Sequence, residues 1–187
     1  MSITIIDSNT ALVVVDLQKG IVALPVAPSG ETTVANAVTL IEAFRRHALP
    51  VVFVNVAGGA PGRNEQPHRA AAFPDDWAEL LPVLNRQAGE HLVTKRTWGA
   101  FTGTDLEAHL RARGVTQVVV VGIATSIGVE STARQAHELG FNVTLAIDAM
   151  SDLSLEAHDN SLARIFPRLG ETGTTQDVIA VLEQRNA

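Results

Sequence analysis

The chain has 187 residues, of which 46% are hydrophobic and 18% are charged, and its formal net charge is −6. This size and composition favour one globular domain (residues 1–187) with a substantial core and exclude an extended disordered chain. The negative charge and the lack of a basic run argue against nucleic acid or an anionic membrane as a partner. Without a cysteine, the chain offers no disulfide, no thiolate metal ligand and no thiol nucleophile.

The amino terminus shows no basic segment followed by a long apolar one, so we expect no signal peptide. The aliphatic runs stop well short of the roughly 20 residues that a membrane span needs. We therefore expect a cytoplasmic protein. We also expect it to form a homo-oligomer, a dimer or a tetramer, and to act on a small molecule.

The first half of the chain alternates between aliphatic runs and helical patterns. A strand is expected at 11–16, a helix at 33–47 and a second strand at 50–56. A loop rich in glycine and proline (58–63) then leads into an irregular region through Asp76. A short helix limited by Pro82 is expected within 77–87, before a third strand at 91–95.

The second half continues the same alternation. A helix at 105–113, closed by Gly114, precedes a strand at 117–121. A helix at about 127–139, a strand at 142–147, and helices at 155–166 and 175–183 complete the chain. Repeated strand–helix units with all-apolar strands predict an α/β fold with a parallel sheet and helices on both faces, although the alternation does not fix the strand order.

Polar features follow three of the predicted strands. Asp16 ends the first strand, Lys95 ends the third, and the small-residue elbow from Gly122 to Gly128 follows the fourth. In an open parallel sheet these positions meet at the carboxyl edge, where ligands bind. A carboxylate and an ammonium in one cleft perturb each other's proton affinity, which suits a general acid or base. Considered singly, Asp16 is also compatible with a loop cap and Lys95 with a surface lysine.

Four stretches of the chain resemble the isochorismatase-like (cysteine hydrolase) family. They are Val13–Gln18 at the first strand end, Thr94–Phe101 around the lysine, Gly122–Arg134 at the elbow, and Ala146–Ala149 in the fifth strand. The resemblance implies a three-layer Rossmann-like fold with about six strands in the order 3-2-1-4-5-6. It also implies an acid at Asp16, a lysine at Lys95, and a cis peptide at Ile123–Ala124.

Gly128 stands where cysteine members of the family carry their nucleophile. The resemblance implies that the N–H groups of Ala124 and Gly128 bind an oxyanion, and that Ile123, Ala124 and Thr125 line the substrate site. Gly128 is equally compatible with close packing at a helix start. Trp98 and Phe101 are assigned to the substrate pocket, with the core or a subunit interface as the alternative.

Isochorismatases of this family also carry glycine at this position and cleave a vinyl ether with an aspartic acid as proton donor. Two departures distinguish this chain from them. Asn55 stands near the second strand end where they have glutamine, and Ile123 replaces the aromatic residue after the loop glycine. Isochorismate hydrolysis itself is therefore one candidate activity among others.

The sequence predicts no metal site and no cofactor. Nicotinamidases of the family bind metal through an Asp-x-His pattern, whereas this region offers only His68, interpreted as a solvent-facing loop residue. His137 and His158 fall within predicted helices and are interpreted as packing or surface residues. The glycines at 58–62 lack the Gly-Lys-Ser/Thr sequence that a phosphate-binding loop would add.

Two classes of function follow from these features. The first is a hydrolase of a small organic substrate that uses Asp16 as the acid or base with Lys95 and Gly128. The second is a non-catalytic or repurposed family member that binds a small carboxylate or a partner protein. Retention of both Asp16 and Lys95 favours the hydrolase.

Overall fold

The computed structural model describes residues 3–65 and 73–184. Within them, six parallel strands form one sheet in the order β3-β2-β1-β4-β5-β6, which confirms the predicted fold class and strand order. The strands are β1 (Thr10–Val15), β2 (Val51–Val56), β3 (His91–Lys95), β4 (Gln117–Ile123), β5 (Asn142–Ser151) and β6 (Glu171–Gly173).

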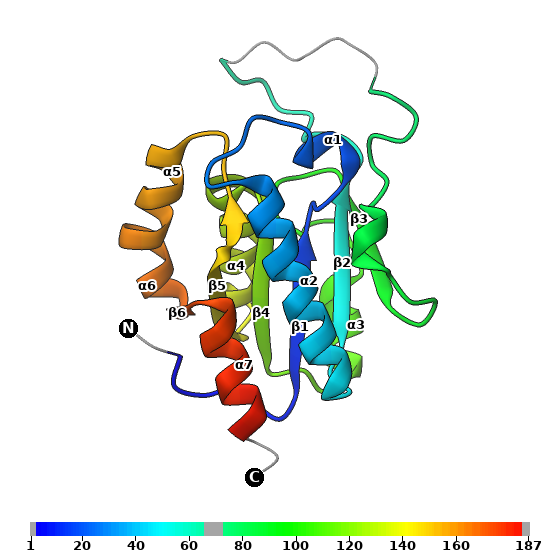
Figure 1. The fold of residues 1–187 in the computed structure, drawn as a ribbon. Coiled ribbons are helices and arrows are strands. Elements are labelled where there is room, and N and C mark those ends of the chain that lie inside the picture. Colours follow the sequence, from blue (N-terminus) through cyan, green and yellow to red (C-terminus); the bar gives the residue numbers. More distant parts are fainter. Residues whose placement is uncertain (1–2, 66–72, 185–187) are drawn as a thin grey trace.

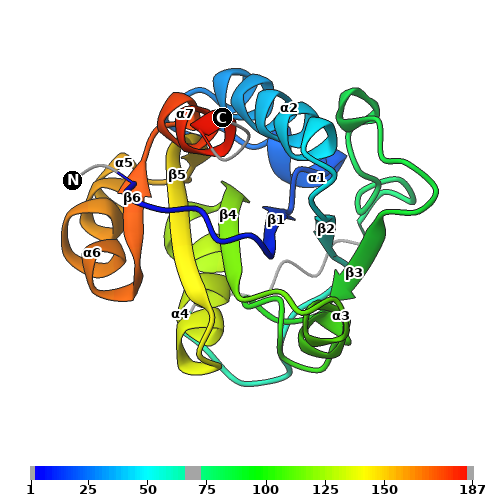
Figure 2. The same ribbon diagram turned by 90° about the horizontal axis from the view of Figure 1, so that it is seen from below.

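Helices cover both faces of the sheet (Figures 1 and 2). The longer ones are α2 (Gly30–Arg46), α3 (Leu106–Ala112), α4 (Glu130–Glu138) and α7 (Thr175–Gln184). Helices α2 and α7 lie on one face, and α3 and α4 lie on the other. The central strands β1 and β4 are fully buried because aliphatic side chains on each face pack against one of these helical layers.

The remaining helical segments are short. They are α1 (Lys19–Val22), a 3₁₀ turn at Pro82–Leu84, π-helical turns at Thr125–Val129 and Ser161–Ile165, α5 (Leu155–Asn160) and α6 (Phe166–Leu169). Together α5 and α6 form the helical segment predicted at 155–166, and they lie beside the β6 edge in Figure 2. The sequence patterns did not indicate α1 or β6, because four- and three-residue elements are too short to show a period.

Several boundaries differ from the expected ones, among them the start of α2 and the end of β5. Helix α2 begins at Gly30 rather than 33, since the Ser29 side chain accepts a hydrogen bond from the Thr32 N–H and caps the helix there. Strand β5 extends to Ser151, past the bulge between Val120 and Gly122 in its pairing with β4. The longer strand carries Asp152 to the carboxyl edge of the sheet.

Gly122 allows β4 to approach β1 closely. Its φ is +128°, and a Cβ added to it would lie 1.9 Å from the Val15 carbonyl oxygen. No other residue type fits this position without moving one of the strands. The glycine therefore fixes how the elbow leaves the sheet beside Asp16.

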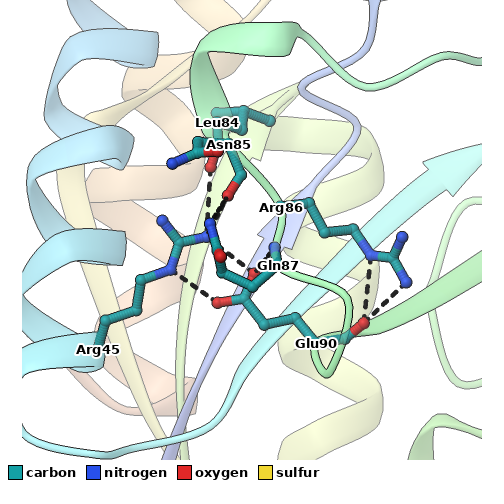
Figure 3. A network of polar contacts seen from close by, with 6 residues as sticks. All are labelled: Arg45, Leu84, Asn85, Arg86, Gln87 and Glu90. Carbon is teal, nitrogen blue, oxygen red and sulfur yellow. Dashed lines mark hydrogen bonds and ion pairs between the residues drawn. The ribbon is translucent and has the colours of Figure 1, made fainter.

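A polar network ties α2 to the loop before β3 (Figure 3). The Arg45 guanidinium contacts both carboxylate oxygens of Glu90 at 2.7 and 2.8 Å and donates to the carbonyls of Leu84 and Asn85. Glu90 in turn accepts a hydrogen bond from the Gln87 N–H. The planar guanidinium suits such a bidentate contact, which anchors the long β2–β3 connection to the helical layer.

Among the described residues, no helix combines the length and the apolar character that crossing a membrane would require.

Candidate active site

Asp16 and Lys95 meet at the carboxyl edge of the sheet. The Lys95 ammonium donates a hydrogen bond of 2.7 Å to Asp16 Oδ2 and another of 3.2 Å to the Thr97 carbonyl. Both side chains are almost completely buried, with 4% of Asp16 and 2% of Lys95 exposed. Strand β2 lies between β1 and β3, so the two charges meet across it.

The surroundings of Asp16 favour its protonated form. Burial raises the pKa of this carboxyl to about 6, although the neighbouring Lys95 opposes the change. Its Oδ1 atom is buried and has no hydrogen-bond partner. Asp16 also has a φ of 54°, a left-handed conformation that is uncommon outside glycine. An acid with a raised pKa and one unpaired oxygen can donate or accept a proton near neutral pH.

The elbow after β4 contains the cis peptide that the family resemblance implies at Ile123–Ala124. A π-helical turn, Thr125–Val129, follows it and leads directly into α4. Gly128 lies in this turn beside Asp16, because an added Cβ would be 3.0 Å from Asp16 Oδ2 and 3.2 Å from Val15 Cγ1. Its φ is not in the left-handed range, so the close approach distinguishes this glycine.

A cavity of about 200 Å³ opens beside these residues. Its polar lining includes Asp16, Lys95 and Thr97, and the elbow contributes Ile123, Ala124, Ile127 and Gly128. Apolar side chains from the surrounding loops complete most of the wall, namely Ile21, Leu24, Val56, Trp77, Trp98 and Leu153. The cavity therefore combines one buried ion pair with a largely apolar surface.

Of the other residues predicted for the substrate site, one lies at the cavity and two do not. Trp98 lines the cavity and is 65% exposed. Thr125 is completely buried behind the elbow, where its hydroxyl is 2.8 Å from His158 Nδ1. Phe101 packs beside Phe141 with ring centroids 5.9 Å apart, and the structure does not bring it to the cavity. The alternative reading of Phe101 as a packing residue fits its position.

Gln18 organises one wall of the cavity, a role the sequence patterns did not reveal. Its buried amide accepts from the Val56 N–H at 2.8 Å and donates to the carbonyls of Val56 and Trp77. The Trp77 indole then packs over Gly20, where an added Cβ would lie 1.9 Å from the ring. Because these contacts span the β2–β3 connection, sequence spacing alone could not identify them.

Asp152 supports the elbow from the end of β5. Its carboxylate accepts hydrogen bonds from the Ser126 N–H at 2.6 Å and the Ser154 N–H at 3.2 Å. Its backbone also pairs with Ala27. Asp152 is 2% exposed, so these contacts hold the loop from within the protein rather than from its surface. Because the fifth strand was expected to end at 147, the sequence pattern did not single out Asp152.

The segment after Lys95 is held by α4. The Ala100 N–H donates to Thr132 Oγ1, and the Phe101 N–H donates to Gln135 Oε1. Thr132 donates in turn to the Gly128 carbonyl at 2.6 Å. Helix α4 therefore connects the lysine segment with the elbow and fixes their relative positions.

Among the described residues, no group of three His, Asp or Glu side chains is arranged to hold a metal ion. His158 is buried against Thr125, and burial lowers its pKa. His137 lies on α4, where its ring is 3.1 Å from the Leu169 carbonyl. His68, interpreted as a loop residue, falls in the 66–72 stretch that the structure does not describe.

Comparisons with known proteins identify the family of the chain and agree with its fold. The isochorismatase domain model matches residues 10–177. The chain is 48% identical over 178 residues to the isochorismatase family protein YwoC of Bacillus subtilis, covering 91% of this chain and 93% of YwoC. It is also 31% identical over 176 residues to the ureidoacrylate amidohydrolase RutB of Variovorax paradoxus, covering 78% and 70% of the two chains.

A solved structure of an isochorismatase family protein from Burkholderia thailandensis superposes with a TM-score of 0.93. It is 44% identical in sequence, and the match covers 97% of this chain and all of that one. The fold, the matched domain and the identity over most of the chain agree on one conclusion. The chain belongs to the isochorismatase family of hydrolases.

Proposed function

We propose that this protein hydrolyses an enol-ether (vinyl-ether) bond in a small organic substrate, with Asp16 as the general acid. The observation that carries the proposal is the state of the Asp16 carboxyl. It is buried, one oxygen is bound by Lys95 and the other has no partner, and its pKa is raised to about 6. Such a group is protonated below about pH 6 and in part above it, at the edge of a largely apolar cavity.

The first step is protonation of carbon. The Asp16 O–H bond breaks as its proton forms a new bond to the terminal carbon of the enol ether. The double-bond electrons supply that bond, and the ether oxygen stabilises the resulting oxocarbenium ion. Lys95 stabilises the carboxylate left on Asp16, because its ammonium already contacts Oδ2 at 2.7 Å.

The second step is capture by water. Water adds to the oxocarbenium carbon, and the proton that it loses returns to Asp16. The hemiketal or hemiacetal then breaks down to a carbonyl compound and an alcohol. We propose that the backbone N–H groups of Ala124 and Gly128, in residues that line the cavity, donate to the alcohol oxygen as it leaves the hemiketal or hemiacetal and develops negative charge.

No covalent intermediate is part of this proposal. Amide hydrolysis by the family's thiol chemistry would require a cysteine, and the sequence has none. We take Gly128 to stand at the corresponding place; it lies beside Asp16 and carries no side chain. The similarity to an amidohydrolase such as RutB therefore supports a shared fold and site more than a shared reaction.

The test is hydrolysis of cyclohexyl vinyl ether in D₂O. Protonation of carbon by the enzyme places one deuterium on the methyl group of the released acetaldehyde, which mass spectrometry detects after rapid trapping. Asp16→Asn is the matched control, because it keeps the shape of the side chain and removes the acid. Ammonia release from simple amides without turnover of any enol ether would contradict the proposal.

A further inference from the structure

We infer that the substrate of this cavity is an uncharged, largely apolar molecule rather than a carboxylate. This inference rests on the proposed function only in taking the cavity as the place where the substrate binds.

The charges that line the cavity cancel one another. Asp16 and Lys95 are the ionisable residues among the described cavity lining, and they form a buried pair with an Nζ–Oδ2 distance of 2.7 Å. An entering carboxylate would have to compete with Asp16 for the same ammonium. The Lys95 ammonium already donates to the Thr97 carbonyl as well, so its hydrogen-bonding capacity is largely used.

Charged groups on the neighbouring segments have other partners. The Lys19 ammonium contacts Asp76 at 3.0 Å and Glu79 at 2.6 Å. Arg96 is exposed, and its guanidinium donates to the Ala57 carbonyl at 3.3 Å. The Asp152 carboxylate, behind the elbow, would repel an anion rather than attract it. Of these described cations, Lys19 is neutralised by two carboxylates, whereas Arg96 is exposed and does not belong to the cavity lining.

The rest of the wall suits an apolar ligand. Its lining includes the apolar side chains of Ile21, Leu24, Trp77, Trp98, Ile127 and Leu153. The cavity volume of about 200 Å³ fits one small ring with a short substituent. A carboxylate moved from water into such a place loses its hydration and finds no unpaired counter-charge, whereas the backbone N–H groups at the elbow can serve a neutral carbonyl oxygen as well. Isochorismate, with two carboxylates, is therefore a poor match for this site.

Binding of a matched pair of probes tests the inference directly. Cyclohexanecarboxamide and cyclohexanecarboxylate have nearly the same shape and differ in charge at pH 8. The two tryptophans of the chain, Trp77 and Trp98, both line the cavity, so their fluorescence reports occupancy. We expect the carboxamide to bind at least about 10-fold more tightly than the carboxylate.

The variant Asp16→Asn sharpens the test, because it leaves the Lys95 charge uncompensated. In this variant we expect the carboxylate affinity to rise by about 10-fold or more and the carboxamide affinity to change by less than about threefold. Circular dichroism checks that the variant is folded, and the comparison within the wild-type protein does not depend on it.

Equal or tighter binding of the carboxylate by the wild-type protein would overturn the inference, as would failure of the carboxamide to bind at millimolar concentration. Turnover of an enol ether is measured separately from these affinities. A protein that hydrolyses enol ethers but prefers the carboxylate would refute this inference alone. One that prefers the carboxamide but shows no carbon protonation would refute the proposed reaction alone.

Discussion

Gly128 faces Asp16 so closely that a Cβ built on the glycine would lie 3.0 Å from the Asp16 Oδ2 atom. The same oxygen accepts the hydrogen bond from Lys95. A side chain at position 128 would therefore enter the group of atoms formed by the carboxylate and the ammonium. We infer that glycine is needed at position 128 because it places no side-chain atoms between Asp16 and the cavity.

Replacing Gly128 with cysteine is predicted to create a reactive thiol. The nearby Lys95 ammonium and the start of the helical turn favour a thiolate, and Asp16 can accept the proton. Iodoacetamide should label the folded variant faster at pH 7 than the unfolded chain. Gly128→Ala is the matched control for the added Cβ, and we expect it to destabilise the protein by about 1–3 kcal/mol. A folded thiol that reacts no faster than the unfolded one would contradict this prediction.

Activity is predicted to follow the protonation of Asp16. Since the protonated carboxyl is the active form and its pKa is about 6, kcat/KM for an enol ether should be constant below pH 6. Above that pH it should fall about tenfold for each pH unit. A rate that instead rises through pH 6 would show that Asp16 acts as a base.

Lys95→Met should move that pH profile upward. The lysine lowers the pKa of Asp16, so its removal leaves burial unopposed and raises the pKa further. The break in log kcat/KM should therefore appear at a higher pH, together with a lower maximal rate because the carboxylate product loses its counter-charge. An unchanged break would show that Lys95 does not influence the catalytic proton.

Three glycine-to-alanine variants should separate backbone strain from close packing. Gly122→Ala introduces both effects, because the residue has a φ of +128° and the new Cβ would lie 1.9 Å from the Val15 carbonyl oxygen. We expect it to lower the free energy of unfolding by more than about 3 kcal/mol. Gly103→Ala introduces backbone strain alone, because the residue has a φ of +68° and no atom lies within 4 Å of the new Cβ. We expect it to lower the free energy of unfolding by about 1–2 kcal/mol. Gly89→Ala meets neither and serves as the control. Urea unfolding measures all three, and equal losses would refute this account.

Asp152→Asn is predicted to weaken catalysis without touching the substrate. The amide can accept one of the two N–H groups that the carboxylate holds, so the elbow at Ser126 loses its support or the Ser154 N–H loses its partner. We expect kcat to fall several-fold with little change in the affinity for cyclohexanecarboxamide. Ser154→Ala, which keeps its own N–H bonded to Asp152, is the matched control. A loss of stability with kcat unchanged would assign Asp152 a purely structural role.

Much of the fold could be predicted from the sequence because its cause is local. All-apolar runs form strands buried on both faces, and glycines end helices, so β1 to β5 and the longer helices lie near their expected positions. The strand order came from the resemblance, and the structure confirms it. Strand β6 and helix α1 are too short to leave a periodic signal.

For the candidate site, too, the sequence predicted some features and could not predict others. Asp16, Lys95 and the elbow could be singled out from the sequence because each follows a strand, and parallel strands end at one edge. Their burial, the unpaired Asp16 oxygen and the apolar wall depend on segments that are far apart in the chain. Only the tertiary structure could place Phe101 against Phe141, Thr125 against His158 and Trp77 over Gly20. Sequence patterns record which way a residue faces within its own element, whereas the contacts that tune the acid form between elements.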